Sequence, residues 1–186
     1  MIVGIDEVGR GCWAGPLVAG AVLLGAPIKG LKDSKKLTKL QRERLNGIIL
    51  EKAVAVGLGW VSSVEVDELG LTEAVRLAMR RALAEITVPY DQIIIDGNYN
   101  FLADNPKAEK LIKADDLIPA VSAASIVAKV ARDRYMAALT GDYEKYEFAR
   151  HVGYGTKLHR QLLAEHGVSD IHRRSFKPVW LTLGSL

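Results

Sequence analysis

The chain begins with an apolar stretch that ends in two acids, Ile2-Val3-Gly4-Ile5-Asp6-Glu7. A second apolar run follows at Leu17–Leu24, and the turn-forming sequences Gly9-Arg10-Gly11 and Gly15-Pro16 lie between the two. Both runs are apolar at successive positions, whereas a strand of a surface hairpin alternates apolar and polar residues. The sequence therefore predicts two central strands of one sheet, around which the rest of the fold is built.

Strands and helices follow one another along the rest of the chain. In chain order we expect a capped helix opening at Thr38, a strand at Ala53–Val61, a helix at about Thr72–Ile86, a buried strand at Gln92–Asp96, a long helix from Pro119 and a helix near Thr156–His166. The first helix has a core-facing stripe of Leu40, Leu45, Ile48 and Ile49. From Gly141 onward we expect loops and that one helix. The pattern predicts an α/β fold with a central sheet flanked by helices.

Length and composition exclude several classes of protein. The chain has 186 residues, of which 49% are hydrophobic and 25% charged, and this length corresponds to about one domain. A single cysteine, Cys12, excludes an internal disulfide framework and a multi-cysteine zinc site. No stretch reaches the roughly 18 consecutive apolar residues of a membrane helix, and no signal peptide is visible. We expect a single domain spanning residues 1–186 that is cytoplasmic and monomeric.

The charge of the chain is unevenly distributed. Its net charge is only +3, yet two segments are distinctly basic. Five lysines fall between Lys29 and Lys39 with one acid, Asp33. Between Arg150 and Lys177 the basic residues are Arg150, Lys157, Arg160, Arg173, Arg174 and Lys177, against the acids Glu165 and Asp170. Such clusters suit a polyanionic partner, and ordinary solubilising charge is the alternative.

Carboxylates stand at the ends of the predicted strands. Asp6 and Glu7 end the first strand, Asp96 ends another, and Asp115 and Asp116 follow a third apolar step. Each acid taken singly is explained as a turn former. Together, at converging strand ends, they repel one another unless a cation neutralises them, and an all-oxygen set favours Mg²⁺ or Mn²⁺ over zinc. Two such ions about 4 Å apart activate a water and stabilise the leaving oxygen of a phosphodiester.

A glycine-flanked arginine follows the first pair of acids directly, at Gly9-Arg10-Gly11. Glycines in a tight turn let backbone amides approach a phosphate or a ribose closely. The Arg10 side chain adds a fixed positive charge. The position of this turn, immediately after an acidic strand end, indicates a site for a phosphate-containing ligand.

The segment from Gly4 to Gly11 resembles the N-terminal signature of the bacterial ribonuclease HII family, the type 2 ribonucleases H. Further elements are similar to that family in the same order: Asp33-Ser34-Lys35-Lys36-Leu37, Ile95-Asp96-Gly97, Lys113-Ala114-Asp115, Ser122 to Arg134, Gly153-Tyr154-Gly155-Thr156 with His159, and His172-Arg173-Arg174-Ser175-Phe176. The resemblance extends over nearly the whole chain.

The resemblance implies a ribonuclease H-like fold with a mixed central sheet. It implies an endonuclease that cleaves the RNA strand of RNA–DNA hybrids and cuts 5′ of single ribonucleotides in duplex DNA, leaving 3′-hydroxyl and 5′-phosphate ends. The implied catalytic and metal-binding residues are Asp6, Glu7, Asp96 and Asp115, which hold two Mg²⁺ or Mn²⁺ ions. The chemistry of the residues alone does not choose between Asp115 and Asp116, and the Lys-Ala-Asp element selects Asp115.

The resemblance also implies the contacts to a nucleic-acid substrate. The substrate-binding residues are Gly9, Arg10, Gly11, Ser34, Lys35, Lys36 and Tyr154. The Gly9–Gly11 backbone and Tyr154 sense the ribonucleotide junction, while the lysines and the Arg150–Lys177 cluster meet phosphates. Residues 141–186 form a C-terminal extension that contacts the substrate. For Lys36, a structural role is the alternative to a phosphate contact.

Three residues near these motifs are expected to be structural. We expect Asp133 to take part in an ion pair on the long helix, and His159 and His172 to anchor loops or to lie near a phosphate.

Two rival functions remain open from the sequence. A ribonuclease HIII-like enzyme shares the fold and the acids, but that family has another residue in place of Arg10 and an additional N-terminal domain. A non-catalytic module that binds hybrids is the other rival, and loss of any of the four acids would favour it.

Overall fold

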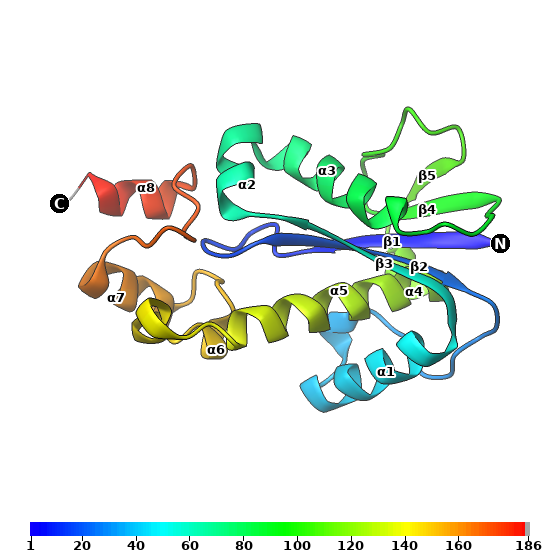
Figure 1. Cartoon of the computed structure of the whole chain (residues 1–186), viewed down its shortest axis with the longest axis horizontal. Helices are drawn as coiled ribbons and strands as arrows, with labels where there is room; N and C mark the ends of the chain where they lie inside the picture. Colours follow the sequence, from blue (N-terminus) through cyan, green and yellow to red (C-terminus); the bar gives the residue numbers. More distant parts are fainter. Residues whose placement is uncertain (185–186) are drawn as a thin grey trace.

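The computed structural model describes residues 1–184 and has a five-stranded mixed sheet at its centre (Figure 1). The strands are β1 (Ile2–Val8), β2 (Leu17–Leu24), β3 (Ala53–Val61), β4 (Gln92–Asp96) and β5 (Ala108–Leu111), in the spatial order β3-β2-β1-β4-β5. Antiparallel pairing joins β1 to β2 and β2 to β3, whereas β4 runs parallel to both β1 and β5. The predicted mixed sheet flanked by helices is confirmed.

Helices cover both faces of the sheet (Figure 1). On one face lie α2 (Ser63–Leu69) and α3 (Leu71–Ala84), and on the other lie α1 (Lys39–Lys52), the short α4 (Ala114–Leu117) and the long α5 (Pro119–Ala137). Each face has its own buried apolar cluster. No helix within residues 1–184 has both the length and the apolarity needed to cross a membrane.

Glycines in the strands let helices approach the sheet closely. A Cβ atom placed on Gly4 of β1 would lie 2.2 Å from the backbone nitrogen of Val121, and one on Gly20 would lie 2.5 Å from the carbonyl oxygen of Ala124. Both clashes are with α5, so this helix packs directly against the backbone of β1 and β2. Because glycine has no side chain at these positions, α5 lies close to the strand that carries Asp6.

The predicted strands and helix starts agree closely with the structure, with two exceptions. The Thr38 capping box is present, since the Gln41 N–H donates to Thr38 Oγ1 and the Thr38 N–H donates to Gln41 Oε1. The core-facing position assigned to Leu40 is wrong, because Leu40 is 81% exposed. The third apolar step is also displaced: β5 ends at Leu111, and Asp115 lies on α4 instead of at a strand end.

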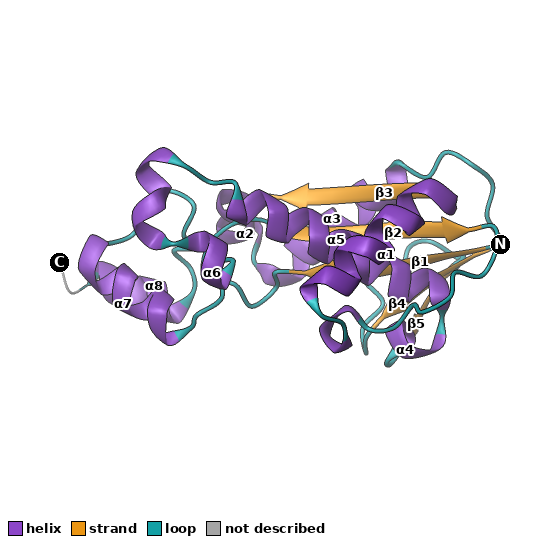
Figure 2. Cartoon of the chain, turned by 90° about the horizontal axis from the view of Figure 1, so that it is seen from below, coloured by secondary structure: helices purple, strands orange, loops and turns teal. Residues whose placement is uncertain are grey.

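The chain from Gly141 onward is more helical than the sequence pattern indicates. It contains the 3₁₀ segment η2 (Gly141–Tyr146) and the helices α6 (Phe148–His151), α7 (Lys157–His166) and α8 (Lys177–Leu183). Only α7 is predicted, because its Thr156 N-cap and apolar stripe are visible in the sequence. These helices lie beyond one end of the sheet, where β1 leads into the Gly-Arg-Gly turn (Figures 1 and 2).

Replacing Gly4 by alanine tests the close packing of α5 on β1. We expect Gly4→Ala to lower the free energy of unfolding by about 1–3 kcal/mol, because the added methyl group must displace backbone atoms of α5. Urea denaturation measures the change. Gly47→Ala on α1 is the matched control, since no atom lies within 4 Å of its Cβ, and it should raise stability by about 0.5–1 kcal/mol. Equal stability of the Gly4 variant and wild type would contradict the packing argument.

Candidate active site

Three carboxylates from separate elements meet at one edge of the sheet. Asp6 lies on β1, Asp96 is the last residue of β4, and Asp115 is on α4, with one oxygen of each within 4.8 Å of the others. The parallel pairing of Ile5 with Ile95 places Asp6 beside Asp96 on the face covered by α5. The predicted convergence of acids is therefore present for these three residues.

Backbone hydrogen bonds orient the carboxylates. The Glu7 N–H donates to Asp6 Oδ1 and the Ala114 N–H donates to Asp96 Oδ1, each at 2.8 Å. The second bond ties the end of β4 to the start of α4. A left-handed residue, Lys113 with φ 58°, turns the chain from β5 into α4. The local structure thus holds Asp115 over the strand ends although it belongs to neither strand.

Burial and mutual repulsion make it costly to ionise these acids together. Burial, followed by the charges of Glu7 and Asp96, raises the pKa of Asp6 to about 8, while a hydrogen bond with Ser125 opposes the rise. Burial and the charge of Asp96 also raise the pKa of Asp115. A divalent cation among the carboxylates would offset both effects. An all-carboxylate oxygen set suits a hard cation such as Mg²⁺ or Mn²⁺.

Glu7 is not one of the three acids whose oxygens approach within 4.8 Å, although it lines the same pocket as Asp6 and its charge acts on Asp6. Successive side chains of a strand point to opposite faces, so Glu7 does not share the face of Asp6. Its Oε1 lies 3.6 Å from Nη1 of Arg10, whose guanidinium also covers the ring of Phe101 at 5.7 Å. Burial raises the pKa of Glu7, and Arg10 opposes the rise.

A pocket of about 210 Å³ lies next to the acids. Its lining residues are Asp6, Glu7, Val8, Gly9, Arg10, Gly11, Ser34, Lys35, Ser125, Lys129 and Tyr154. The structure therefore brings most of the predicted substrate-binding residues together with two of the predicted catalytic acids. Ser125 and Lys129 were not predicted. Their signal in the sequence is a polar stripe of Ser122, Ser125 and Lys129, spaced three and four residues apart on an otherwise apolar helix.

Lys36 is not among the residues that line this pocket. Its Nζ lies 2.6 Å from the carboxylate of Asp116, so that these two residues join η1 (Ser34–Lys36) to α4. This agrees with the structural alternative for Lys36. The two acids of α4 therefore have different partners. Asp115 lies with Asp6 and Asp96, whereas Asp116 is paired with Lys36.

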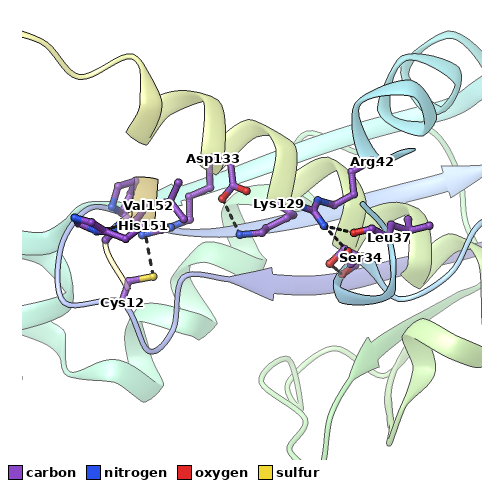
Figure 3. Close-up of polar contacts among 12 residues, drawn as sticks. Cys12, Ser34, Leu37, Arg42, Lys129, Asp133, His151 and Val152 are labelled. Atoms are coloured by element: carbon purple, nitrogen blue, oxygen red, sulfur yellow. Dashed lines mark hydrogen bonds and ion pairs between the residues drawn. The ribbon is translucent and has the colours of Figure 1, made fainter. Parts of the chain in front are cut away.

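Side chains on α1 and α5 hold the lining of the pocket. Arg42 Nη1 donates to the carbonyl oxygens of Ser34 at 2.9 Å and Leu37 at 2.6 Å (Figure 3). Lys129 Nζ donates to Asp133 at 2.8 Å, which confirms the predicted ion pair of Asp133 (Figure 3). These contacts fix the backbone of η1 and restrict Lys129 at the edge of the pocket.

Tyr154 presents a ring and a protonated hydroxyl at the same pocket. The residue is 37% exposed, and its ring lies 5.3 Å from Lys129 Nζ and 5.8 Å from the Arg132 guanidinium carbon. Burial raises its pKa to about 12. Tyr154 therefore combines an apolar face with a hydrogen-bond donor at neutral pH.

The C-terminal basic cluster is not uniformly available to a ligand. Arg173 is fully buried, so its expected contact with phosphates is wrong. His159 and His172 are buried as well, with their Nε2 atoms 3.0 Å apart, and they serve as loop anchors. The remaining basic side chains of the cluster are at least partly accessible.

Comparisons with known proteins match these features. The Ribonuclease HII family model matches residues 3–179. Ribonuclease HII of Shewanella baltica is 47% identical over 191 residues, covering 99% of this chain and 91% of the relative. Ribonuclease H2 of Pyrococcus horikoshii OT3 is similar in structure, with a TM-score of 0.83, 27% identity and coverage of 99% and 97%. The RNase HII in a PCNA complex from Archaeoglobus fulgidus has a TM-score of 0.78, 27% identity and coverage of 98% and 95%.

The raised pKa of Asp6 predicts how stability depends on pH without metal. Since the pKa is about 8 in the folded protein and 3.8 in the unfolded reference, the folded state retains a proton that the unfolded state loses between these values. The free energy of unfolding of the wild type should therefore fall between pH 5 and pH 9 by on the order of a few kcal/mol. Asp6→Asn should remove most of this decline.

Urea denaturation in chelator at pH 5 and pH 9 measures the effect. Asp133→Asn is the control, because Asp133 is an acid on α5 that does not belong to the carboxylate cluster. Its free energy of unfolding should change with pH as that of the wild type does. Identical pH dependence in wild type and Asp6→Asn would show that burial of Asp6 carries no such cost.

The two acids of α4 should differ in metal binding. Asp115→Asn should weaken Mn²⁺ binding by more than about tenfold, because it removes a candidate ligand. Asp116→Asn should change it by less than about twofold, since that carboxylate is engaged by an exposed lysine. Calorimetric titration with Mn²⁺ compares them, and the opposite ranking would assign the ligand role to Asp116.

Proposed function

We propose that this chain, which belongs to the ribonuclease HII family of endonucleases acting on RNA–DNA hybrids, also cuts 5′ of single ribonucleotides embedded in duplex DNA. The products would carry 3′-hydroxyl and 5′-phosphate ends. One observation carries the proposal: the Gly9–Gly11 turn and Tyr154 line the same pocket as Asp6 and Glu7. Groups able to examine one sugar thus lie beside groups able to promote hydrolysis.

We assign the metal site to Asp6, Glu7, Asp96 and Asp115, and propose Mg²⁺ or Mn²⁺ as the ions. When two such ions are bound, they supply the charge that makes a water nucleophilic and stabilises the leaving oxygen of the phosphodiester. The chain's own contribution is to hold Asp6, Asp96 and Asp115 together, with backbone N–H groups orienting Asp6 and Asp96, and to place Glu7 next to Asp6 on β1. Lys35 and Lys129 line the pocket as cations for substrate phosphates.

The two glycines of the turn have different roles in this proposal. Gly9 has φ 83°, and a Cβ there would lie 2.3 Å from Arg132 Nε, so its packing requires a glycine. No atom lies within 4 Å of a Cβ on Gly11. The space beside Gly11 is therefore open to a sugar, and the backbone there can test for a 2′-hydroxyl by hydrogen bonding.

Tyr154 would contribute from the other side of the pocket. Its ring offers a flat face to the neighbouring sugar, and its protonated hydroxyl offers a donor. We propose that the segment from Gly141 onward, which carries Tyr154 and exposed basic side chains, is the substrate-contacting part of a single catalytic domain. A monomeric enzyme is sufficient for this arrangement because one chain supplies every group named.

Cleavage of a labelled DNA duplex carrying one ribonucleotide tests the proposal. We expect cutting 5′ of the ribonucleotide with Mg²⁺ or Mn²⁺, and none with chelator, with Asp6→Asn or with an all-DNA duplex. Cutting of long hybrids alone would reject the claim for single ribonucleotides. Hybrid binding without any cutting would favour the non-catalytic alternative.

The same assay with Gly11→Ala tests the role of the open turn. The methyl group meets no protein atom, so the variant should fold normally but lose about tenfold or more of its activity on the single ribonucleotide. Gly47→Ala is the matched control, because its added methyl group is equally free and lies on α1. Equal activity of the two variants would remove Gly11 from the substrate site.

A further inference from the structure

Two fully buried arginines lie behind the Gly-Arg-Gly turn without an acidic partner. Arg132 and Arg173 are both at 0% exposure, and within residues 1–184 neither forms an ion pair with a carboxylate. Burial, with a contribution from the charge of Arg132, lowers the pKa of Arg173 to about 10, so that it stays cationic at neutral pH. Burying an unpaired cation is costly unless hydrogen bonds compensate it.

The compensating bonds all go to backbone carbonyls. Arg173 donates to Gly15 O at 3.1 and 2.9 Å and to Arg10 O at 3.0 Å. Arg132 donates to Pro16 O at 2.7 Å, Ala14 O at 3.1 Å and Val152 O at 2.8 Å. Five of these six bonds end on the loop from Arg10 to Pro16, so the two guanidinium groups hold its backbone from the core side.

The bond to Arg10 O determines which way the next amide points. The peptide between Arg10 and Gly11 is trans, as are all the described peptides. In a trans peptide the C=O and N–H groups point in opposite directions. Because Arg173 draws the Arg10 carbonyl into the core, the Gly11 N–H is directed away from it. Within residues 1–184 this N–H has no hydrogen-bond partner, and Gly11 lines the pocket.

Arg132 supports the same arrangement from a second direction. Its Nε lies where a side chain on Gly9 would be, and its guanidinium lies against the ring of Tyr154 at 5.8 Å. The bond from Arg132 to Val152 O fixes the segment that leads into Tyr154. One side chain therefore contacts both of the elements assigned to recognition of the sugar.

We propose that Arg173 is a positioning residue that presents the Gly11 N–H to the substrate as a hydrogen-bond donor, with Arg132 holding the turn and Tyr154 in register. The inference rests on the proposed function, since it explains how the turn recognises one ribonucleotide. Arg173 touches no substrate itself. Its buried guanidinium fixes the peptide between Arg10 and Gly11 by bonding to the Arg10 carbonyl. The N–H of the same peptide has no hydrogen bond of its own within residues 1–184.

Arg173→Gln tests the inference, with Asp67→Asn as the matched control. Asp67 anchors the same C-terminal segment by accepting from the N–H groups of Arg174 at 2.7 Å and Ser175 at 3.0 Å, yet it does not touch the turn. Both variants should lower the melting temperature. Only Arg173→Gln should lower the ratio of kcat/KM on a single ribonucleotide to that on a long hybrid, by about tenfold, because a long hybrid offers many 2′-hydroxyls. An unchanged ratio would overturn the inference.

Hydrogen exchange of the Gly11 amide provides a readout that does not depend on cleavage. An RNA–DNA hybrid bound in chelator should slow exchange of this amide in the wild type and not in Arg173→Gln. Equal protection in both proteins would overturn the positioning role.

The amide measurement also separates the two proposals. If the wild type cuts hybrids and not embedded ribonucleotides, the proposed function fails while Gly11 protection still decides the role of Arg173. If Arg173→Gln does not fold, Arg173→Lys replaces it in both measurements, since it keeps the charge and loses the planar set of donors.

Discussion

Repulsion among carboxylates held at one edge of the sheet is the constraint on which the rest of the structure depends. Asp6, Asp96 and Asp115 bring their oxygens within 4.8 Å of one another, and the pKa values of Asp6 and Asp115 are raised. The acids stay together because the strands and the helix that carry them are held in place by backbone hydrogen bonds. Parallel pairing of β1 with β4 places Asp6 beside Asp96, and the bond from the Ala114 N–H to Asp96 ties β4 to the helix that carries Asp115.

The same strand leads directly from the negative group to positively charged surroundings. After Asp6 and Glu7 the chain enters the turn and the loop that follows it to Pro16, whose backbone carbonyls accept hydrogen bonds from two buried guanidinium groups, those of Arg132 and Arg173. In the proposed function, the acidic centre holds the metal ions, and the adjoining turn, with its free amide and basic neighbours, binds a substrate phosphate. Metal-assisted cleavage of a negatively charged phosphodiester requires a metal site and a phosphate-binding site close together. The acids and the turn satisfy this requirement because they follow one another along the chain.

Local signals were sufficient for much of the fold, and they failed where burial depended on distant segments. The limits of β2 and β3 were predicted correctly, as was the Thr38 capping box, because continuous apolar runs and caps involve neighbours in the sequence. Leu40 was misplaced because an apolar residue in the first turn of a helix faces the core only if another element covers it. Of the elements after Gly141, α7 was predicted, whereas η2, α6 and α8 were not, because segments of four to seven residues are too short to show a helical pattern.

The sequence by itself determined the chemical composition of the candidate site: acids at strand ends, a glycine-flanked arginine and a basic C-terminal segment, in an order that identified the family. Tertiary structure decided which members of those sets act together. It placed Asp115 among the acids and Asp116 on Lys36, and it turned Arg173 from an expected phosphate contact into a buried support of the Arg10 carbonyl. Residue type limits what a side chain can do, but burial and the partner within hydrogen-bond distance depend on contacts between segments far apart in the chain.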